Sequence, residues 1–375
     1  MAMAMATDAS SIDSTLFPLC TFLLSIYTLG ISADVFISST AHFAHRLHVS
    51  ETLISLLTAG AEWEELAVVV AAVAQRRPKL ALGNVLGSCV ANILGAFSLG
   101  VLAQGEAIVR YDVSAKIYAV VLFGVTTGVA VLWGFGQLEG HVYGAVLVVV
   151  FGLYLAGIGW SIYRGVLDAP EESDAESDDD DDSDSESEGD PEVRSAPGGG
   201  IPREGNPGPE GVDESSALIG RRRTRPSTLF YLVKLILAFV ALSISGYVLS
   251  HSSQSLAARF NVSETVFGAT LLSLATTLPE KFVAVISGYR GHPGIMVANT
   301  VGSNIFLLTL CLGVTILSSK SLAQGSSYTN EIVWTWTSSA FLTVMILLGT
   351  HRLVGLAMLL AYVGFIVLEF TLYKP

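Results

Sequence analysis

The chain has 375 residues, of which 51% are apolar and only 14% are charged. Its mean hydropathy of +0.58 excludes an ordinary soluble globular protein, and nothing in its composition points to a nucleic-acid partner. The formal net charge of −13 is confined to one stretch, because residues 168–226 carry 19 acidic and 6 basic side chains while the rest of the chain is balanced.

Ten apolar runs follow one another along the chain, each about 20 residues long, which is the length of helix that crosses a hydrocarbon core of about 30 Å. We therefore predict an all-α, multi-pass integral membrane protein with ten transmembrane helices, surrounded by the lipid bilayer. The sequence does not distinguish the plasma membrane from an endomembrane. The predicted spans are 16–40, 50–74, 82–104, 116–135, 141–163, 227–250, 262–288, 294–318, 330–349 and 352–373.

The stretch between the fifth and sixth runs has a different composition. Residues 168–226 begin with Asp, Glu and Ser and continue with a segment rich in Pro and Gly, so they cannot bury a core. We predict a disordered linker, which is either a solvated connection or a regulatory tract that is phosphorylated or attracts Ca²⁺ weakly. Any partner of this tract is unknown. Arginines at 164 and 221–223 flank the linker, which favours a cytosolic position.

The two halves of the chain carry the same motifs. HRLHVSET, from His45, matches ARFNVSET, from Ala258. Further along, GNVLGSCVANI, from Gly83, matches ANTVGSNIFLL, from Ala298, at an offset of 215 residues. A long chain with internal matches of this kind is read as a repeat.

We predict two repeats of five helices, residues 1–167 and 227–375, joined by the linker. Because each repeat has an odd number of spans, the second is inverted relative to the first. Transporters built in this way bind their ions near the midplane, where interrupted helices meet. Pro279 in ATTLPEKF predicts such an interruption, since proline cannot donate a backbone hydrogen bond.

With these motifs the chain resembles the calcium/cation antiporter family, whose best-known members are sodium/calcium exchangers. Repeats of that family typically read GAD…A…RLGVS…GTSLPEL and then GNVVGSNI. Here SADVFISSTAHFAHRLHVS, GNVLGSCVANI, LATTLPEKF and ANTVGSNIF stand in those places. The resemblance extends over nearly every span. It implies a secondary antiporter without a cofactor, and not an enzyme, that exchanges Ca²⁺ for Na⁺, H⁺ or K⁺ by alternating access.

The resemblance also implies which residues bind the transported Ca²⁺ or Na⁺. The family has one coordinating glutamate in each repeat, and these positions fall on Glu65 and Glu280. Hydroxyl and amide oxygens complete the implied site, and such hard donors suit both ions. These further positions are Thr276, Thr277, Ser88, Ser303 and Asn92.

The first repeat departs from the family pattern. GTSLPEL is replaced by GAEWEEL, and the second-repeat position that matches Asn92 is Leu307. Glu62 and Glu65 are three residues apart and share a helix face, so both can point at one site. Glu62 therefore either replaces the carboxylate missing at Leu307 or is solvated in a vestibule. Glu64, which occupies the place of the proline, is expected to be solvated.

Two other features of the motifs have local interpretations. Lys281 follows Glu280 directly and is expected to point away from the site toward water or a vestibule. Gly83 and Gly87 are four residues apart, a spacing that lets helix backbones approach closely and would bring Ser88 near the site.

The number of carboxylates in the site limits how many ions can be exchanged in each transport cycle. Two buried carboxylates neutralise one Ca²⁺ or two monovalent ions. Glu62, as a third carboxylate, would allow three monovalent ions, or Ca²⁺ with a proton. Without a cation the like-charged pair would take up protons, so proton coupling stays open beside sodium.

Two rival functions do not involve antiport. One is a membrane sensor or scaffold that no longer transports; Leu307 favours this function, whereas the intact LPE motif opposes it. The other is a channel, which suits paired acidic sites less well than alternating access does.

Overall fold

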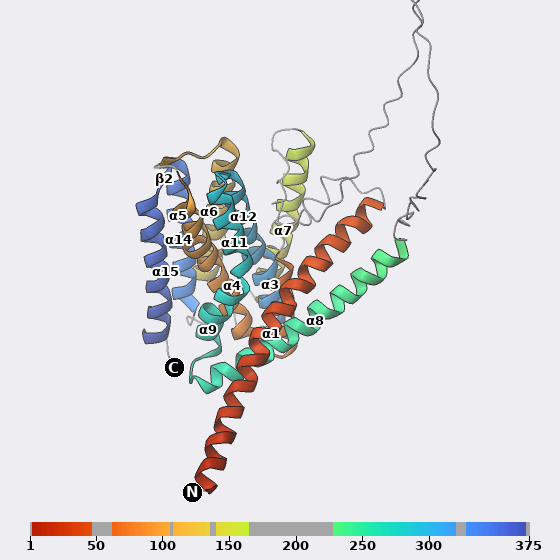
Figure 1. Ribbon diagram of the computed structural model, residues 1–375. Coiled ribbons are helices and arrows are strands. Elements are labelled where there is room, and N and C mark those ends of the chain that lie inside the picture. The colour runs from red at the N-terminus through yellow and green to blue at the C-terminus, as the bar shows by residue number, and fades with distance from the viewer. Residues whose placement is uncertain are drawn as a thin grey trace, which may run out of the picture. The chain divides into compact units, whose positions relative to one another are not determined.

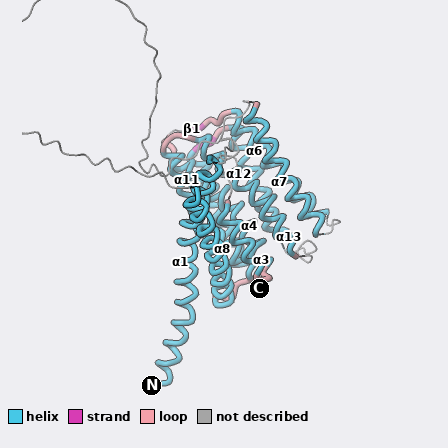
Figure 2. The backbone as a smooth tube through the Cα atoms, turned by 90° about the vertical axis from the view of Figure 1, so that its right-hand side faces the viewer, coloured by secondary structure: helices cyan, strands magenta, loops and turns pink. Residues whose placement is uncertain are grey.

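The computed structural model describes residues 2–46, 62–105, 108–135, 140–164, 228–319 and 328–372, and these are almost entirely helical (Figure 1 and Figure 2). The first half contains α1 (Ala2–Arg46), α3 (Trp63–Ala74), α4 (Pro78–Val90), the π-helix η1 (Ala91–Phe97), α5 (Ser98–Ala103), α6 (Val113–Phe135) and α7 (Gly140–Tyr163). The second half contains α8 (Thr228–Arg259), α9 (Glu264–Phe267), η2 (Gly268–Leu272), α10 (Ser273–Thr276), α11 (Leu278–Tyr289), α12 (Pro293–Phe306), η3 (Leu307–Cys311), α13 (Leu312–Ser318), α14 (Thr329–Leu348) and α15 (Arg352–Leu372). Two short antiparallel strands, β1 (Ile108–Val109) and β2 (Thr350–His351), pair with each other.

The described residues contain eight helices long and apolar enough to cross a membrane, or nine if the bent pair Glu264–Thr276 and Leu278–Tyr289 is one span. This confirms the prediction of an all-α membrane protein. α3 is too short to cross alone, and residues 47–61 before it lie outside the described part. The count of ten helices and the inversion of the second repeat therefore stay predictions, and the predicted linker also lies outside the described residues.

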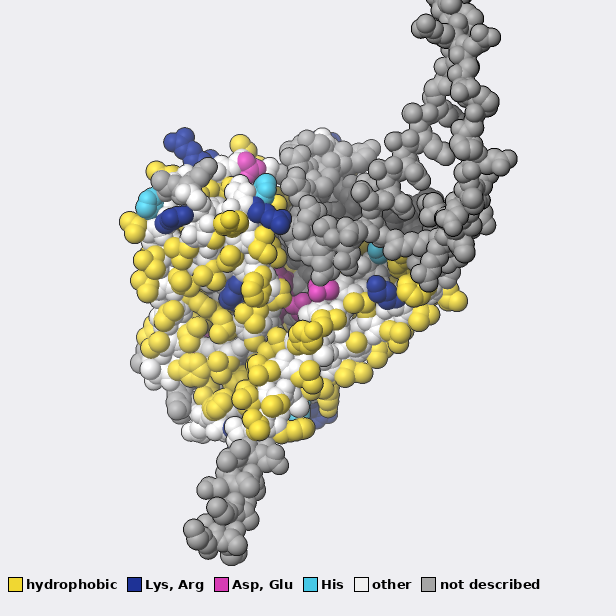
Figure 3. Space-filling model, in the orientation of Figure 1, with side chains coloured by type: hydrophobic (Ala, Val, Ile, Leu, Met, Phe, Trp, Pro, Cys, Tyr) yellow, Lys and Arg dark blue, Asp and Glu magenta, His cyan; other side chains and the backbone are white. Residues whose placement is uncertain are grey.

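Two continuous helical runs, each with a π-helical segment in its middle, form the centre of the bundle. One run leads from α4 through η1 into α5, and the other leads from α12 through η3 into α13. In these runs 89% and 78% of the most apolar stretch is buried, against 28% or less in α1, α6, α7, α8 and α15. The outer helices therefore turn most of their surface outward, and apolar side chains cover the face seen in Figure 3.

Helix boundaries recur between the two halves. α3 and α11 each have 12 residues and end in a tight turn, where Arg76 and Gly291 have φ angles of 59° and 75°. The next helix begins at Pro78 or Pro293, a residue suited to the first helical position. A π-helical segment then follows in both halves. The matching motifs of the sequence thus have matching local structures.

α4 packs against α9 and η2 at backbone distance. A Cβ atom at Gly83 would lie 2.3 Å from the carbonyl oxygen of Thr265, and one at Gly87 would lie 2.3 Å from that of Ala269. No side chain fits at such distances, so glycine is required at both positions. The predicted close approach is confirmed. It holds α4, which carries Ser88, in contact with the second half of the chain.

The start of α3 is held between outer and central helices. α1 and α8 run side by side in both views, and α8 also packs on α3 (Figure 1 and Figure 2). The Trp63 ring lies 5.3 Å from that of Phe36 on α1 and 6.5 Å from that of Phe306 on α12. Edge-on aromatic contacts of this kind fix the position of the neighbouring Glu62.

Candidate functional site

A sharp bend in the second half places Glu280 at the site. The helical segments before and after Thr277 are bent by 49° relative to each other, and Thr277 itself leaves helical geometry with φ −90° and ψ 19°. Pro279 lies in the first turn of α11, where its missing N–H leaves no helical hydrogen bond unmade. The predicted interruption is confirmed, and it puts Glu280 in the first turn of α11, where the helix dipole favours a carboxylate.

The first half begins α3 in the corresponding way without a proline. Glu62 has a non-helical ψ of 72°, and α3 starts at the next residue, so Glu65 also lies in a first turn. Glu62 is buried, with 8% of its surface exposed, and is not a solvated bystander. Its burial disagrees with a solvated side chain, and its part in the site stays a prediction.

Glu65 is enclosed by hydrogen-bond donors from both halves of the chain. Its Oε1 accepts from the Ser88 hydroxyl at 2.8 Å and from the Thr276 hydroxyl at 2.6 Å, and its Oε2 accepts from the Asn84 amide. The Glu65 side chain is fully buried. A hydroxyl that donates to a carboxylate can rotate and present its lone pairs to a cation instead. The structure thus joins Glu65, Ser88 and Thr276, as the sequence predicted.

Glu280 lies opposite Glu62. The carboxylates of Glu62, Glu65 and Glu280 lie close enough to interact electrostatically with one another. Two carboxylates that face each other repel unless a proton or a cation lies between them. The three glutamates therefore form one acidic cluster to which each half of the chain contributes.

Several buried oxygens of this region lack a hydrogen-bond partner among the described residues. They belong to Glu280 (Oε2), Ser303 (Oγ) and Asn92 (Oδ1), and the Asn92 amide nitrogen also lacks a partner. Buried polar atoms are normally paired, so oxygens of this kind suit a transported cation. Among the described residues no group of three or more His, Cys, Asp or Glu side chains converges closely enough to hold a metal ion.

The Thr277 side chain makes no hydrogen bond to the glutamates. Its hydroxyl donates to the Ser273 carbonyl oxygen at 2.6 Å, and both its hydroxyl and its carbonyl oxygen accept from the Lys281 ammonium. The expectation that Lys281 points to water is wrong, since only 9% of its surface is exposed.

Asn84 is a site residue that the sequence reasoning missed. It lies in α4 one turn before Ser88, on the same face, and donates to Glu65. The GN pair of the GNVLGS motif, four residues before the predicted serine, was the available signal.

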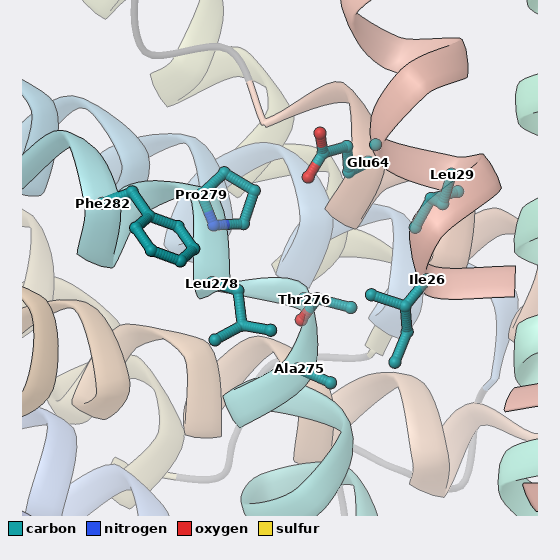
Figure 4. A pocket seen from close by; sticks show the side chains of 9 residues that line it. Ile26, Leu29, Glu64, Ala275, Thr276, Leu278, Pro279 and Phe282 are labelled. Atoms are coloured by element: carbon teal, nitrogen blue, oxygen red, sulfur yellow. The ribbon is translucent and has the colours of Figure 1, made fainter. Parts of the chain in front are cut away.

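A pocket of about 250 Å³ lies beside the site, between α1, α3 and the bend at Thr277 (Figure 4). Glu64 reaches into it, and Thr276 connects it to Glu65. The pocket is otherwise lined by apolar residues: Ile26, Leu29, Gly30, Ala275, Leu278, Pro279 and Phe282. Acidic side chains are visible in the recess at the centre of Figure 3.

Comparison with known proteins gives consistent likenesses. An uncharacterized membrane protein of Methanocaldococcus jannaschii is 23% identical over 286 residues, which is 76% of each chain. The sodium/calcium exchanger MaX1 of Methanosarcina acetivorans is 30% identical over 139 residues, which is 36% of this chain and 39% of that one. A solved structure of the sodium-calcium exchanger NCX_Mj, soaked with Na⁺ and Sr²⁺, matches with a TM-score of 0.55 and 20% identity, covers 94% of this chain and 99% of the other, and shows the fold alone.

The family model described as sodium/calcium exchanger protein matches residues 17–160 and 230–371. This match covers well over half of the chain and includes every described residue of the acidic cluster. The chain is therefore a multi-pass integral membrane protein that belongs to the sodium/calcium exchanger protein family of cation antiporters.

Proposed function

We propose that the protein is a secondary active antiporter that exchanges Ca²⁺ for a monovalent cation, which is Na⁺, K⁺ or H⁺, at the cluster of Glu65, Glu280 and Glu62. One observation carries the proposal: Glu65 accepts hydrogen bonds from Ser88 of the first half and from Thr276 of the second. A carboxylate held by both halves changes its surroundings when the halves move relative to each other, as alternating access requires.

The chemistry of the cluster supports Ca²⁺ as a substrate. Its donors are carboxylate, hydroxyl and amide oxygens, which are the hard ligands that Ca²⁺ and Na⁺ prefer over nitrogen or sulfur. Ca²⁺ takes six to eight oxygen ligands. The Oε2 of Glu280, Oγ of Ser303 and Oδ1 of Asn92 supply buried oxygens that are not engaged within the described residues.

The proposal includes the domain organisation. It assigns residues 1–167 and 227–375 to two inverted repeats of five helices, joined by the acidic linker 168–226. The recurrence of helix lengths, prolines and π-helical segments between the halves supports a repeat. Inversion would let the same local structures form the site from both sides of the membrane.

Flux through reconstituted protein tests this function. Purified protein is placed in liposomes, and Ca²⁺ uptake is followed with a trapped dye under separate outward gradients of Na⁺, K⁺ and H⁺. We expect uptake with at least one gradient, and the effective gradient identifies the counter-ion. Glu280→Gln should lower uptake at least about tenfold, since one charged ligand is lost.

A matched control is Glu369→Gln, which neutralises a fully buried glutamate on α15, outside the cluster. It should transport as the unaltered protein does. Absence of Ca²⁺ uptake under every gradient would refute antiport, and retained Ca²⁺ binding in that case would support the sensor alternative. Equal uptake by Glu280→Gln and the control would refute the site assignment alone.

A further inference from the structure

Lys281 is a buried lysine beside the proposed transport site. It follows Glu280 directly in α11, and 9% of its surface is exposed. Its side chain passes the backbone of η1, where a Cβ atom at Gly95 would lie 3.6 Å from its Cε. Lysine is almost never buried unless its ammonium has partners, so the groups around its Nζ decide what it does.

The partners of Lys281 are two oxygens of one residue. Its Nζ donates to the carbonyl oxygen of Thr277 at 3.1 Å and also to the Thr277 hydroxyl oxygen. The hydroxyl proton of Thr277 is already donated to the carbonyl oxygen of Ser273, so its oxygen presents lone pairs to Lys281. A carbonyl and a hydroxyl oxygen that converge at a helix break are the donors that bind monovalent cations in interrupted helices.

We infer that the Lys281 ammonium is a built-in cation, which occupies the oxygens of Thr277 in place of a transported monovalent ion and lowers by one the number of counter-ions moved per cycle. The inference rests on the proposed antiport and specifies its stoichiometry. Glu280 and Glu65 are the carboxylates that act on this ammonium.

The charge of the site follows from this arrangement. The ionised carboxylates of Glu62, Glu65 and Glu280 carry three negative charges, and the fixed ammonium offsets one of them. One Ca²⁺ or two monovalent ions then balance the remainder, and buried charges must be balanced in this way. Exchange of two monovalent ions for one Ca²⁺ moves no net charge. Without the ammonium the same carboxylates would admit three monovalent ions, and each cycle would move one net charge.

The structure also gives a reason for the site to keep this lysine. A transported ion at Thr277 must be dehydrated and released in every cycle, whereas a tethered ammonium stays in place. It holds both Thr277 oxygens while the cations beside Glu65 and Glu280 come and go. Lys281 is therefore a specificity-determining residue for the number of ions, and it acts through charge rather than by contact with Ca²⁺.

Charge movement tests the inference. Proteoliposomes are loaded with the effective counter-ion, the membrane potential is clamped with K⁺ and valinomycin, or with a proton ionophore if K⁺ is the counter-ion, and the Ca²⁺ ratio at zero net flux is measured. For the unaltered protein we expect a ratio that does not change with voltage. For Lys281→Met we expect one net charge per cycle, so that 100 mV shifts the ratio about 50-fold.

The Hill coefficient for the counter-ion should rise from about two to about three in Lys281→Met. Lys79→Met, which removes an exposed lysine at the start of α4, is the matched control and should leave both readouts unchanged. An unaltered protein that moves net charge would overturn the inference even if Lys281→Met does not fold. Unchanged voltage dependence in Lys281→Met would overturn it as well.

These outcomes are distinct from a failure of the proposed function. If the unaltered protein moves no Ca²⁺ under any gradient, the antiport itself is wrong, and the assignment of Lys281 falls with it. If Ca²⁺ moves and Glu280→Gln abolishes the movement, the antiport stands, and the voltage dependence alone decides the role of Lys281.

Discussion

Gly87→Ala should destabilise the protein by forcing α4 away from η2. The added Cβ would lie 2.3 Å from the carbonyl oxygen of Ala269 and 2.5 Å from its Cα. Non-bonded heavy atoms prefer separations of about 3.5 Å, so the two helices must separate by about 1 Å. Overpacking of this kind costs about 1–3 kcal/mol, because the obstructing atoms belong to the backbone and cannot rotate away.

The same displacement should weaken Ca²⁺ binding. Ser88 follows Gly87 directly and donates to Glu65 at 2.8 Å, while Thr276 donates to the same oxygen from the other side at 2.6 Å. When α4 and η2 separate by about 1 Å, one of these two bonds exceeds the usual hydrogen-bond range. Hydrogen bonds to charged groups contribute about 1.5–3 kcal/mol, which corresponds to a loss of about 10- to 100-fold in apparent affinity.

Two assays and one control separate these effects. Thermal unfolding in detergent reports stability, and the Ca²⁺ dependence of uptake in liposomes reports affinity. Gly128→Ala on α6 makes the same chemical change where nothing lies within 4 Å of the new Cβ, and helix propensity alone predicts equal or higher stability there. Equal melting temperatures and affinities for the two variants would refute the close contact at Gly87.

Two further substitutions give sharp expectations. Asn84→Ala removes a donor to Glu65, so apparent Ca²⁺ affinity in the uptake assay should fall about tenfold, and an unchanged affinity would contradict the role of Asn84. Tyr111→Phe removes a hydrogen bond of 2.7 Å to the Thr350 hydroxyl, so thermal unfolding should show a loss of about 1 kcal/mol. Burial raises the pKa of Tyr111 to about 12, above its unfolded value of about 10. The buried neutral phenol therefore stabilises the fold fully below about pH 10, and this contribution is lost as the pH rises toward 12, so melting temperature should fall more steeply there in the unaltered protein than in Tyr111→Phe.

The sequence predicted those parts of the site that depend on local chemistry. Pro279 cannot donate the backbone hydrogen bond that continues a helix, so this one residue was enough to predict the break at Thr277. Gly83 and Gly87 lack side chains, so their spacing predicted the close approach of α4. Motif matching then placed Glu65, with its partners Ser88 and Thr276, and the structure brings these three together.

Lys281 shows why the surroundings of a side chain cannot be predicted from helical spacing alone. The Lys281 side chain is turned about 100° from that of Glu280 around the helix, so the two side chains are correctly not expected to point the same way. Helical side chains also lean toward the N-terminus, and this lean carries the long lysine side chain back over one turn to Thr277. Whether water or protein lies there depends on η1, whose contact with α11 comes from distant sequence.

Glu62 and Leu307 finally allow a test of whether a carboxylate has changed its place in the site. Leu307 is fully buried at the start of η3, and Glu62 is buried and interacts electrostatically with Glu280. If Glu62 supplies the charge that Leu307 lacks, Glu62→Ser should lower apparent Ca²⁺ affinity about 10- to 100-fold, because a charged ligand is lost. Adding Leu307→Asp to Glu62→Ser should then restore much of that affinity, whereas adding Leu307→Asn, which has similar size and no charge, should not. Uptake with an unaltered Ca²⁺ dependence in Glu62→Ser would show that Glu62 carries no part of the transported charge, and equal behaviour of the two double variants would show that size at 307, not charge, decides.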